Sequence, residues 1–295
     1  MSRSIEIRID PGAGFCFGVV NAIETATRLL RQGEVFCLGE MVHNGEEIRR
    51  LESLGMKTIS HEDLGRMKGR TVLIRAHGEP PSTYDVARDA GALLVDATCP
   101  VVLGLQQKVR KAWEEGRLAG IQIVIYGKPG HAEVTGLNGQ IDNQAIVIST
   151  PVATASIDPA RPVALFSQTT MDPEGFRQLE LQIREKLEPF RQPVKVYSKI
   201  CRQVSGRAEG LIAFARSVDV LLFVSGQNSS NGKALFAIAR EANARSYFVS
   251  SPQDVQKDWL EGCAVAGVSG ATSTPRWLLH TVAEQVKECT ESGNA

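Results

Sequence analysis

The fold is indicated most directly by the stretch Leu93-Leu94-Val95-Asp96-Ala97-Thr98-Cys99-Pro100. Its first residues form a short, mostly apolar run, which predicts a strand, and an amphipathic helical pattern follows at 101–115. The cysteine lies between the two, where a strand ends and a helix begins. Ligands of α/β proteins bind at such junctions. The stretch therefore predicts a βα unit that places a cysteine where a ligand would bind.

The same alternation of strand and helix patterns continues through the rest of the chain. Besides an N-terminal strand within residues 1–10, we expect strands at 35–38, 71–75, 93–96, 121–126, 145–148, 163–166, 220–224, 246–249 and 264–268. Helical patterns occupy 19–31, 46–54, 101–115, 173–187, 206–217, 232–243 and 275–287. Alternating strands and helices indicate βαβ units, so the expected fold class is α/β, with parallel sheets flanked by helices.

The composition is that of an ordinary α/β protein, and 295 residues suffice for two or three compact domains. The 33 basic and 33 acidic residues cancel, which argues against nucleic-acid binding because that function needs a basic excess. No apolar stretch approaches the roughly 20 residues of a membrane span, and residues 1–10 lack the apolar core of a signal peptide. We therefore expect a cytoplasmic protein with no nucleic-acid or membrane partner, in which local groups hold any anionic ligand.

The chain contains six cysteines: Cys16, Cys37, Cys99, Cys201, Cys263 and Cys289. None of them forms a CxxC pair, which excludes a zinc ribbon and a ferredoxin-type run. In a reducing compartment, cysteines are more often metal ligands or core residues than disulfides. Any metal site must therefore take its ligands from distant parts of the chain.

Three cysteines lie at similar junctions and are followed by polar loops at similar distances. The junctions are 14–18, 96–100 and 199–202, which contain Cys16, Cys99 and Cys201. A first polar loop follows 27 to 32 residues later and a second follows 61 to 72 residues later. The polar residues of these loops are, in order, His43 and His77, His131 and Thr169, and Asn228 and Ser273. This order predicts three related α/β units, at 1–97, 98–197 and 198–295, around one centre.

The surroundings of the cysteines separate candidate ligands from core residues. Cys37 lies in the apolar run Val35–Leu38 and is expected in the core, as are the two C-terminal cysteines. Glycine or proline brackets Cys16 and Cys99 at turns where backbone amides can donate to sulfur, whereas Cys201 is indicated mainly by the repeat. Three thiolates on a 4Fe-4S cluster would leave one iron open to substrate, as in an open catalytic metal site.

Three of the five histidines, His43, His77 and His131, lie beside glycine or asparagine in turn-rich loops that follow strands. Protonated imidazoles suit a diphosphate because they combine positive charge with hydrogen-bond donors. They would supply the positive field that a neutral chain lacks. His61 and His280 are expected to be structural or surface residues instead.

Two further polar loops, at 226–232 and 270–275, open helical patterns. Hydroxyls, carboxamides and the amides of a helix N-terminus form a cradle for anions. The candidate ligands are Asn228, Ser229, Ser230, Asn231 and Ser273. Helix capping would need only one such residue, so the run of four indicates anion binding as well.

Glu133 follows His131 by two residues in the same loop. Beside a buried cluster, desolvation and negative charge would raise the pKa of this carboxyl and make it a proton donor. Thr169 is a candidate to orient or relay that proton. The alternative is an ordinary surface glutamate, which the sequence leaves open.

Seven motifs, taken in order, resemble those of the 4-hydroxy-3-methylbut-2-enyl diphosphate reductase family, which catalyses the last step of the methylerythritol phosphate route to isoprenoids. The motifs lie at 14–19, 42–44, 75–78, 96–100, 130–134, 168–170 and 228–231. The resemblance spans nearly the whole chain. It implies three α/β domains arranged with pseudo-threefold symmetry around a central iron–sulfur site.

The resemblance also implies a site and a reaction. Cys16, Cys99 and Cys201 would ligate a 4Fe-4S cluster with one open iron. The diphosphate would be held by His43, His77, His131, Asn228, Ser229, Ser230, Asn231 and Ser273. Two electrons, from a ferredoxin or flavodoxin, and two protons would remove the hydroxyl as water and give isopentenyl and dimethylallyl diphosphate. Glu133, supported by Thr169 and His131, would supply the proton. The protein would act as a monomer or homodimer.

The chain departs from the family pattern at some positions. The family usually has threonine at the position of Val204, proline at Ala132 and a second acid at Thr135. These departures leave open a divergent paralog that uses the same 4Fe-4S site to reduce a different small molecule. A metal-free, non-enzymatic module that binds phosphorylated ligands is the third reading.

Overall fold

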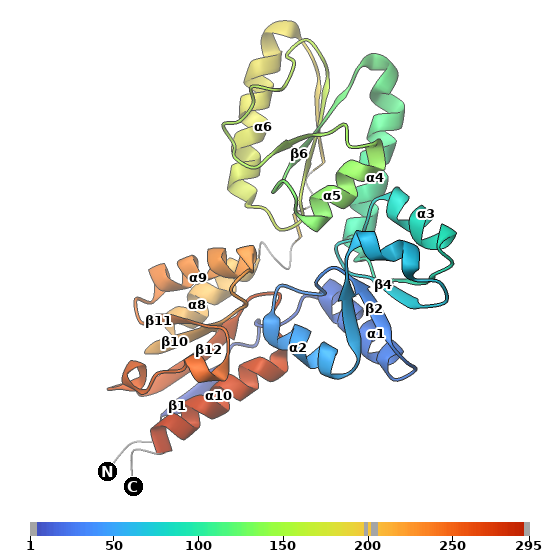
Figure 1. Cartoon of the computed structure of the whole chain (residues 1–295). Helices are drawn as coiled ribbons and strands as arrows, with labels where there is room; N and C mark the ends of the chain where they lie inside the picture. The colour runs from blue at the N-terminus through green and yellow to red at the C-terminus, as the bar shows by residue number, and fades with distance from the viewer. Residues whose placement is uncertain (1–4, 198–199, 202–205, 292–295) are drawn as a thin grey trace. The chain divides into compact units, whose positions relative to one another are not determined.

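The fold consists of three four-stranded sheets in which every strand pairing is parallel. The computed structural model describes residues 5–197, 200–201 and 206–291. Helices flank the sheets (Figure 1), so the expected α/β class with parallel sheets is confirmed. In the ranges described, none of the helices combines the length and the apolar character that crossing a bilayer requires.

Sheet A is built mainly from the C-terminal part of the chain, in the strand order β1-β12-β10-β11. Its strands are β1 (Glu6–Ile9), β10 (Val220–Val224), β11 (Ser246–Val249) and β12 (Val265–Gly270). Alternate side chains of β10 enter two core clusters. One cluster is shared with α10 (Arg276–Glu291), and the other with α8 (Arg207–Arg216) and α9 (Ser230–Ala242). Helices therefore cover both faces of sheet A.

Sheets B and C are built from the residues between these two ends. Sheet B comprises β2 (Val35–Leu38), β3 (Met56–Ile59), β4 (Thr71–Ile74) and β5 (Leu93–Asp96). Sheet C comprises β6 (Gln122–Tyr126), β7 (Ile146–Ile148), β8 (Val163–Ser167) and β9 (Val194–Tyr197). Among the described residues, the remaining α-helices are α1 (Phe17–Leu30), α2 (Gly45–Ser53), α3 (Pro81–Asp89), α4 (Pro100–Gly116), α5 (Ala132–Asn138) and α6 (Pro173–Leu187). Short 3-10 turns include Gly139–Ile141, which directly follows α5.

All three sheets share one topology. The orders β3-β2-β4-β5, β7-β6-β8-β9 and β11-β10-β12-β1 match strand for strand. The last strand of each order leads into a cysteine junction: β5 precedes Cys99, β9 precedes Cys201 and β1 precedes Cys16. The repeat predicted from the polar loops is therefore present in the strand order.

The N-terminal strand corrects one expected boundary. Residues 1–97 were expected to fold together, but β1 pairs with β12 and completes sheet A. Periodicity along the sequence cannot reveal this pairing because the two strands lie at opposite ends of the chain. The chain divides into two compact units: unit 1 comprises Met1–Ile23, Glu40–Gly55 and Arg202–Ala295, and unit 2 comprises Glu24–Gly39 and Met56–Cys201. The division into three domains with the expected boundaries otherwise stays a prediction.

A buried ion pair anchors the loop that leads from β1 to Cys16. Asp10 and Arg207 are 4% and 7% exposed, and the Arg207 guanidinium binds the Asp10 carboxylate. Arg207 Nη2 also donates to Ser269 Oγ at 2.7 Å, and Ser269 Oγ donates to Asp10 Oδ2 at 2.8 Å. The amide of Gly12 donates to Asp10 Oδ1 at 2.9 Å. The network ties the loop after β1 to the start of α8 and to β12.

Because one partner of a buried pair cannot be removed without leaving the other uncompensated, we expect Arg207→Ala to lower the free energy of unfolding by about 3–5 kcal/mol. Arg177→Ala is the matched control, since it breaks an exposed pair with Glu174 and should cost much less. Denaturant unfolding of both variants measures the difference. Equal losses would contradict an anchoring role for Arg207.

Candidate active site

Each candidate cysteine donates its backbone amide to a polar loop. The acceptors are the carbonyls of Thr272 for Cys16 (3.2 Å), Ala76 for Cys99 (3.0 Å) and Thr169 for Cys201 (2.9 Å). In each case the loop follows a strand that lies in the same sheet as the strand leading into that cysteine. The bonds hold the three cysteines beside the loops that carry the predicted residues Ser273, His77 and Thr169.

The predicted anion loops of unit 1 lie together. Ser229 is the N-cap of α9, where its Oγ accepts from the amide of Gly232 at 3.0 Å, so the capping role is real. The same Oγ lies 3.2 Å from Ser273 Oγ. Asn231 Nδ2 donates to Thr272 Oγ1 at 3.0 Å, and Thr272 in turn accepts the amide of Cys16. Hydroxyl and carboxamide groups therefore gather beside one candidate ligand cysteine.

Two further predicted residues of unit 1, His43 and Asn228, line a cavity of about 670 Å³. His43 precedes α2, and a Cβ on Gly226 would overlap the carbonyl oxygen of His43. The loop after β10 and the loop before α2 are therefore in backbone contact. Ser230 begins α9, but its side chain lies outside what the structure describes, as does Val204.

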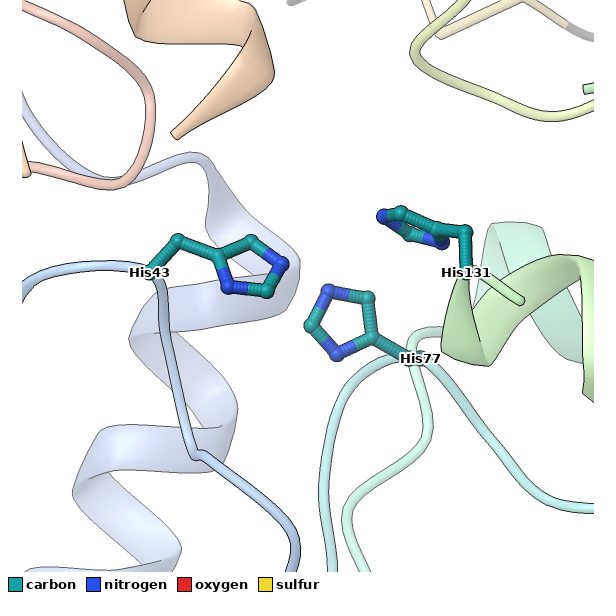
Figure 2. Close-up of side chains that lie close together, drawn as sticks. All are labelled: His43, His77 and His131. Atoms are coloured by element: carbon teal, nitrogen blue, oxygen red, sulfur yellow. The ribbon is translucent and has the colours of Figure 1, made fainter. Parts of the chain in front are cut away.

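Unit 2 brings His77 and His131 together (Figure 2). The ring centroids are 5.5 Å apart, and the planes meet at 79°. His131 is the N-cap of α5, and its Nδ1 accepts from the amide of Glu133 at 3.2 Å. Since Nδ1 is the acceptor, a neutral His131 carries its proton on Nε2 and presents a donor there.

Glu133 lies on the first turn of α5 and is 2% exposed. Thr169 holds both carboxylate oxygens: its amide donates to Oε1 at 2.7 Å, and its Oγ1 donates to Oε2 at 2.8 Å. These bonds favour the charged form, but burial outweighs them and raises the pKa of Glu133 to about 7. The group is therefore not an ordinary surface glutamate. It can both hold and release a proton near neutral pH.

The cysteine environments fit a metal centre held by three of the six thiols. All six cysteines lie among the described residues, and none of them forms a disulfide. Cys16 and Cys99 lie directly before α1 and α4, where the positive end of each helix dipole favours an anionic ligand. Cys37 is fully buried, its Sγ donates to the carbonyl of Gly39 at 3.2 Å, and desolvation raises its pKa to about 12. The expectation that Cys37 is an inert core residue is confirmed.

Some residues that shape the site were missed by sequence reasoning. The buried Asp10–Arg207–Ser269 network was not foreseen, although a charged residue between apolar segments is a signal that it is paired. Glu47 was also missed: it is 1% exposed on α2 and accepts from Trp277 Nε1 at 2.7 Å. This bond joins the helix after His43 to the helix after Ser273, within unit 1.

Known proteins resemble this chain over almost its whole length. The family model described as LytB protein matches residues 7–287. A protein of Parabacteroides distasonis named 4-hydroxy-3-methylbut-2-enyl diphosphate reductase is 47% identical, covering 98% of this chain and 99% of its own. A protein of the same name from Porphyromonas gingivalis is also 47% identical, with 96% of this chain and 99% of its own covered.

Solved structures agree with the fold. One is described as (E)-4-hydroxy-3-methyl-but-2-enyl diphosphate reductase, the terminal enzyme of the non-mevalonate pathway. It superposes with a TM-score of 0.75 at 32% identity, covering 96% of this chain and 99% of its own. A reductase structure from Plasmodium falciparum gives a TM-score of 0.81 at 22% identity, covering 96% of this chain and 88% of its own, and supports the fold alone.

The pKa of Glu133 gives stability a pH dependence. A carboxyl with a pKa of about 7 when folded and 4.5 when unfolded binds more protons in the folded chain between these values, so stability falls as the pH rises through this range. Relative to Glu133→Gln, we expect the wild type to lose on the order of 3 kcal/mol between about pH 4.5 and pH 8, measured by denaturant unfolding.

Glu174→Gln is the control for this measurement. Glu174 is exposed, and hydrogen bonds from Arg177 and Gln178 lower its pKa to about 2, so it stays ionised throughout the range. Its replacement should leave the pH profile unchanged. A wild-type profile parallel to that of Glu133→Gln would show that burial does not raise the pKa of Glu133.

Proposed function

The chain belongs to the LytB protein family, and from this membership we propose that it reduces 4-hydroxy-3-methylbut-2-enyl diphosphate to isopentenyl and dimethylallyl diphosphate. The main support for this proposal is the 47% identity, over nearly the whole chain, to proteins named 4-hydroxy-3-methylbut-2-enyl diphosphate reductase. Removal of the hydroxyl as water consumes two electrons and two protons. The chain must therefore bind a diphosphate, hold an electron carrier and deliver protons.

Members of the family are iron–sulfur enzymes, and we assign a 4Fe-4S cluster to Cys16, Cys99 and Cys201. When bound, the cluster supplies the electrons and one iron without a protein ligand. This assignment is supported by the position of two of these cysteines at helix N-termini and by the amide hydrogen bonds that orient all three. Ferredoxin or flavodoxin as donor, a monomeric or homodimeric state and a cytoplasmic location stay predictions.

Binding of the diphosphate is assigned to side chains rather than to the overall charge, which is zero. In unit 1 the donors are Ser229, Asn231 and Ser273, supported by the amides at the N-terminus of α9. In unit 2 the donors are His77 and His131, whose rings adjoin. His43, Asn228 and Ser230 complete the proposed set.

Proton delivery is assigned to Glu133. Its pKa of about 7 keeps a substantial protonated fraction at neutral pH, which suits a general acid. Thr169 fixes the carboxyl through two hydrogen bonds and so sets the direction in which the proton leaves. His131 is linked to the same turn through the amide of Glu133.

The other readings are less well supported. The relatives described above carry the reductase name, and no observation favours a paralog with a different substrate. A metal-free binding module would not account for a buried glutamate with a pKa near 7 whose carboxyl is held by Thr169.

Glu133→Gln tests the proton donor. The variant keeps the shape of the side chain but cannot deliver a proton, so kcat should fall by about 10²–10⁴-fold. KM should change little because Glu133 bonds to Thr169 rather than to the diphosphate loops. Steady-state kinetics with a strong one-electron donor and iron analysis of the same sample measure both. An unchanged kcat would remove Glu133 from this role.

Single serine variants test the cluster ligands. Anaerobically reconstituted wild type should hold about four irons per chain, and Cys16→Ser, Cys99→Ser and Cys201→Ser should each lose most of this iron and the activity. Cys37→Ser is the control and should keep both. If the wild type takes up no iron and yet binds the substrate, the metal-free reading prevails. If it takes up iron but does not turn the substrate over, the paralog reading prevails.

A further inference from the structure

Glycines bring the loop after β4 into backbone contact with α5, within unit 2. A Cβ on Gly136 of α5 would lie 3.4 Å from the carbonyl oxygen of Gly78. A Cβ on Gly139, directly after α5, would lie 2.8 Å from Cγ of Pro80 and closer still to its Cβ. A side chain at Gly139 would therefore displace Pro80, whereas one at Gly136 would meet the loop at ordinary contact distance. Segment 78–80 therefore packs directly against α5 and the turn that follows it.

Gln106 of α4 fills the remaining space at this contact. Its Nε2 would lie 2.7 Å from a Cβ on Gly78 and 3.0 Å from one on Gly136. The residue is 6% exposed, and among the described residues its Nε2 has no hydrogen-bond partner. Gln106 therefore contributes contact surface here rather than a hydrogen bond. Gly78 has φ +69°, a backbone conformation that also favours glycine.

Both histidines of unit 2 belong to the segments that meet at this contact. His77 precedes Gly78 in the chain, and His131 caps the same short helix that contains Gly136. The two backbones touch at the glycines, and the two rings lie 5.5 Å apart. Any movement of the loop away from α5 would therefore move one ring relative to the other.

We propose that Gly78, Gly136 and Gln106 form a positioning joint that fixes the spacing of His77 and His131. The joint sets how well the two rings can donate to one diphosphate at the same time. The effect of the joint on diphosphate affinity rests on the proposed function, whereas its effect on the spacing of the two imidazole rings does not. The joint residues act through the histidines and touch no substrate themselves.

Gly136→Ala tests the joint, with Gly104→Ala on α4 as the matched control. An added Cβ at Gly104 meets nothing within 4 Å. An added Cβ at Gly136 would lie 3.0 Å from Gln106 Nε2 and would have to displace that amide. Alanine is the better helix former at both sites, so a loss at position 136 reflects this displacement and not helix propensity. For the reconstituted Gly136→Ala enzyme, the Kd for inorganic diphosphate and the KM for the substrate should rise roughly 10- to 100-fold. The kcat and iron content should stay near those of the wild type, and Gly104→Ala should change none of these quantities.

A crystal structure of the reconstituted Gly136→Ala enzyme separates the two claims. An unchanged spacing of the His77 and His131 rings would overturn the joint. A changed spacing with an unchanged Kd for inorganic diphosphate would uphold the joint and count against diphosphate binding by these histidines.

If Gly136→Ala does not fold, two variants at Gln106 test the joint instead. Gln106→Met keeps the length of the side chain without the amide and should bind inorganic diphosphate like the wild type. Gln106→Ala removes the contact surface and should weaken binding, with the iron content retained. Wild-type affinity in Gln106→Ala would overturn the joint, and so would equal weakening by both substitutions.

Discussion

Three hydrogen bonds from cysteine amides to loop carbonyls organise the chemistry of this chain. Each bond is worth only about 1 kcal/mol of stability, but each fixes where a thiol lies relative to a polar loop. Because the bonds are made by backbone atoms, they constrain position and leave the side chains free to differ. This explains why the repeat is visible in the spacing of polar residues while their identities vary among histidine, threonine, asparagine and serine.

The two compact units contribute different chemistry. Unit 1 gathers hydroxyl and carboxamide groups at the start of α9 and beside Cys16, which suits recognition of an anion without a large charge. Unit 2 holds two adjoining imidazoles and a carboxyl whose burial outweighs its two hydrogen bonds. Desolvation is thus the dominant electrostatic effect at Glu133. It converts a common acid into a group that titrates near neutrality.

The sequence was sufficient for much of the fold, whereas the roles of the candidate site residues stay predictions. The long apolar strands and the polar junctions predicted the α/β class, the core position of Cys37 and the residues that adjoin in each unit. Strand β3 was missed because only Met56 of its four residues is fully buried, so its pattern is weakly apolar. Helix α5 was missed because it is short and begins inside the glycine–histidine motif. The Asp10–Arg207 pair joins residues far apart in the chain, which no local pattern reports.

The placement of β1 has a consequence for how the protein is made. This strand is synthesised well before its hydrogen-bonding partner β12, because all the other strands lie between them in the chain. Sheets B and C can close while translation continues, whereas sheet A must wait for the C-terminal residues. The loop that carries Cys16 is therefore secured only after β12 has been synthesised. Maturation of a metal centre that uses this thiol would have to wait for that step.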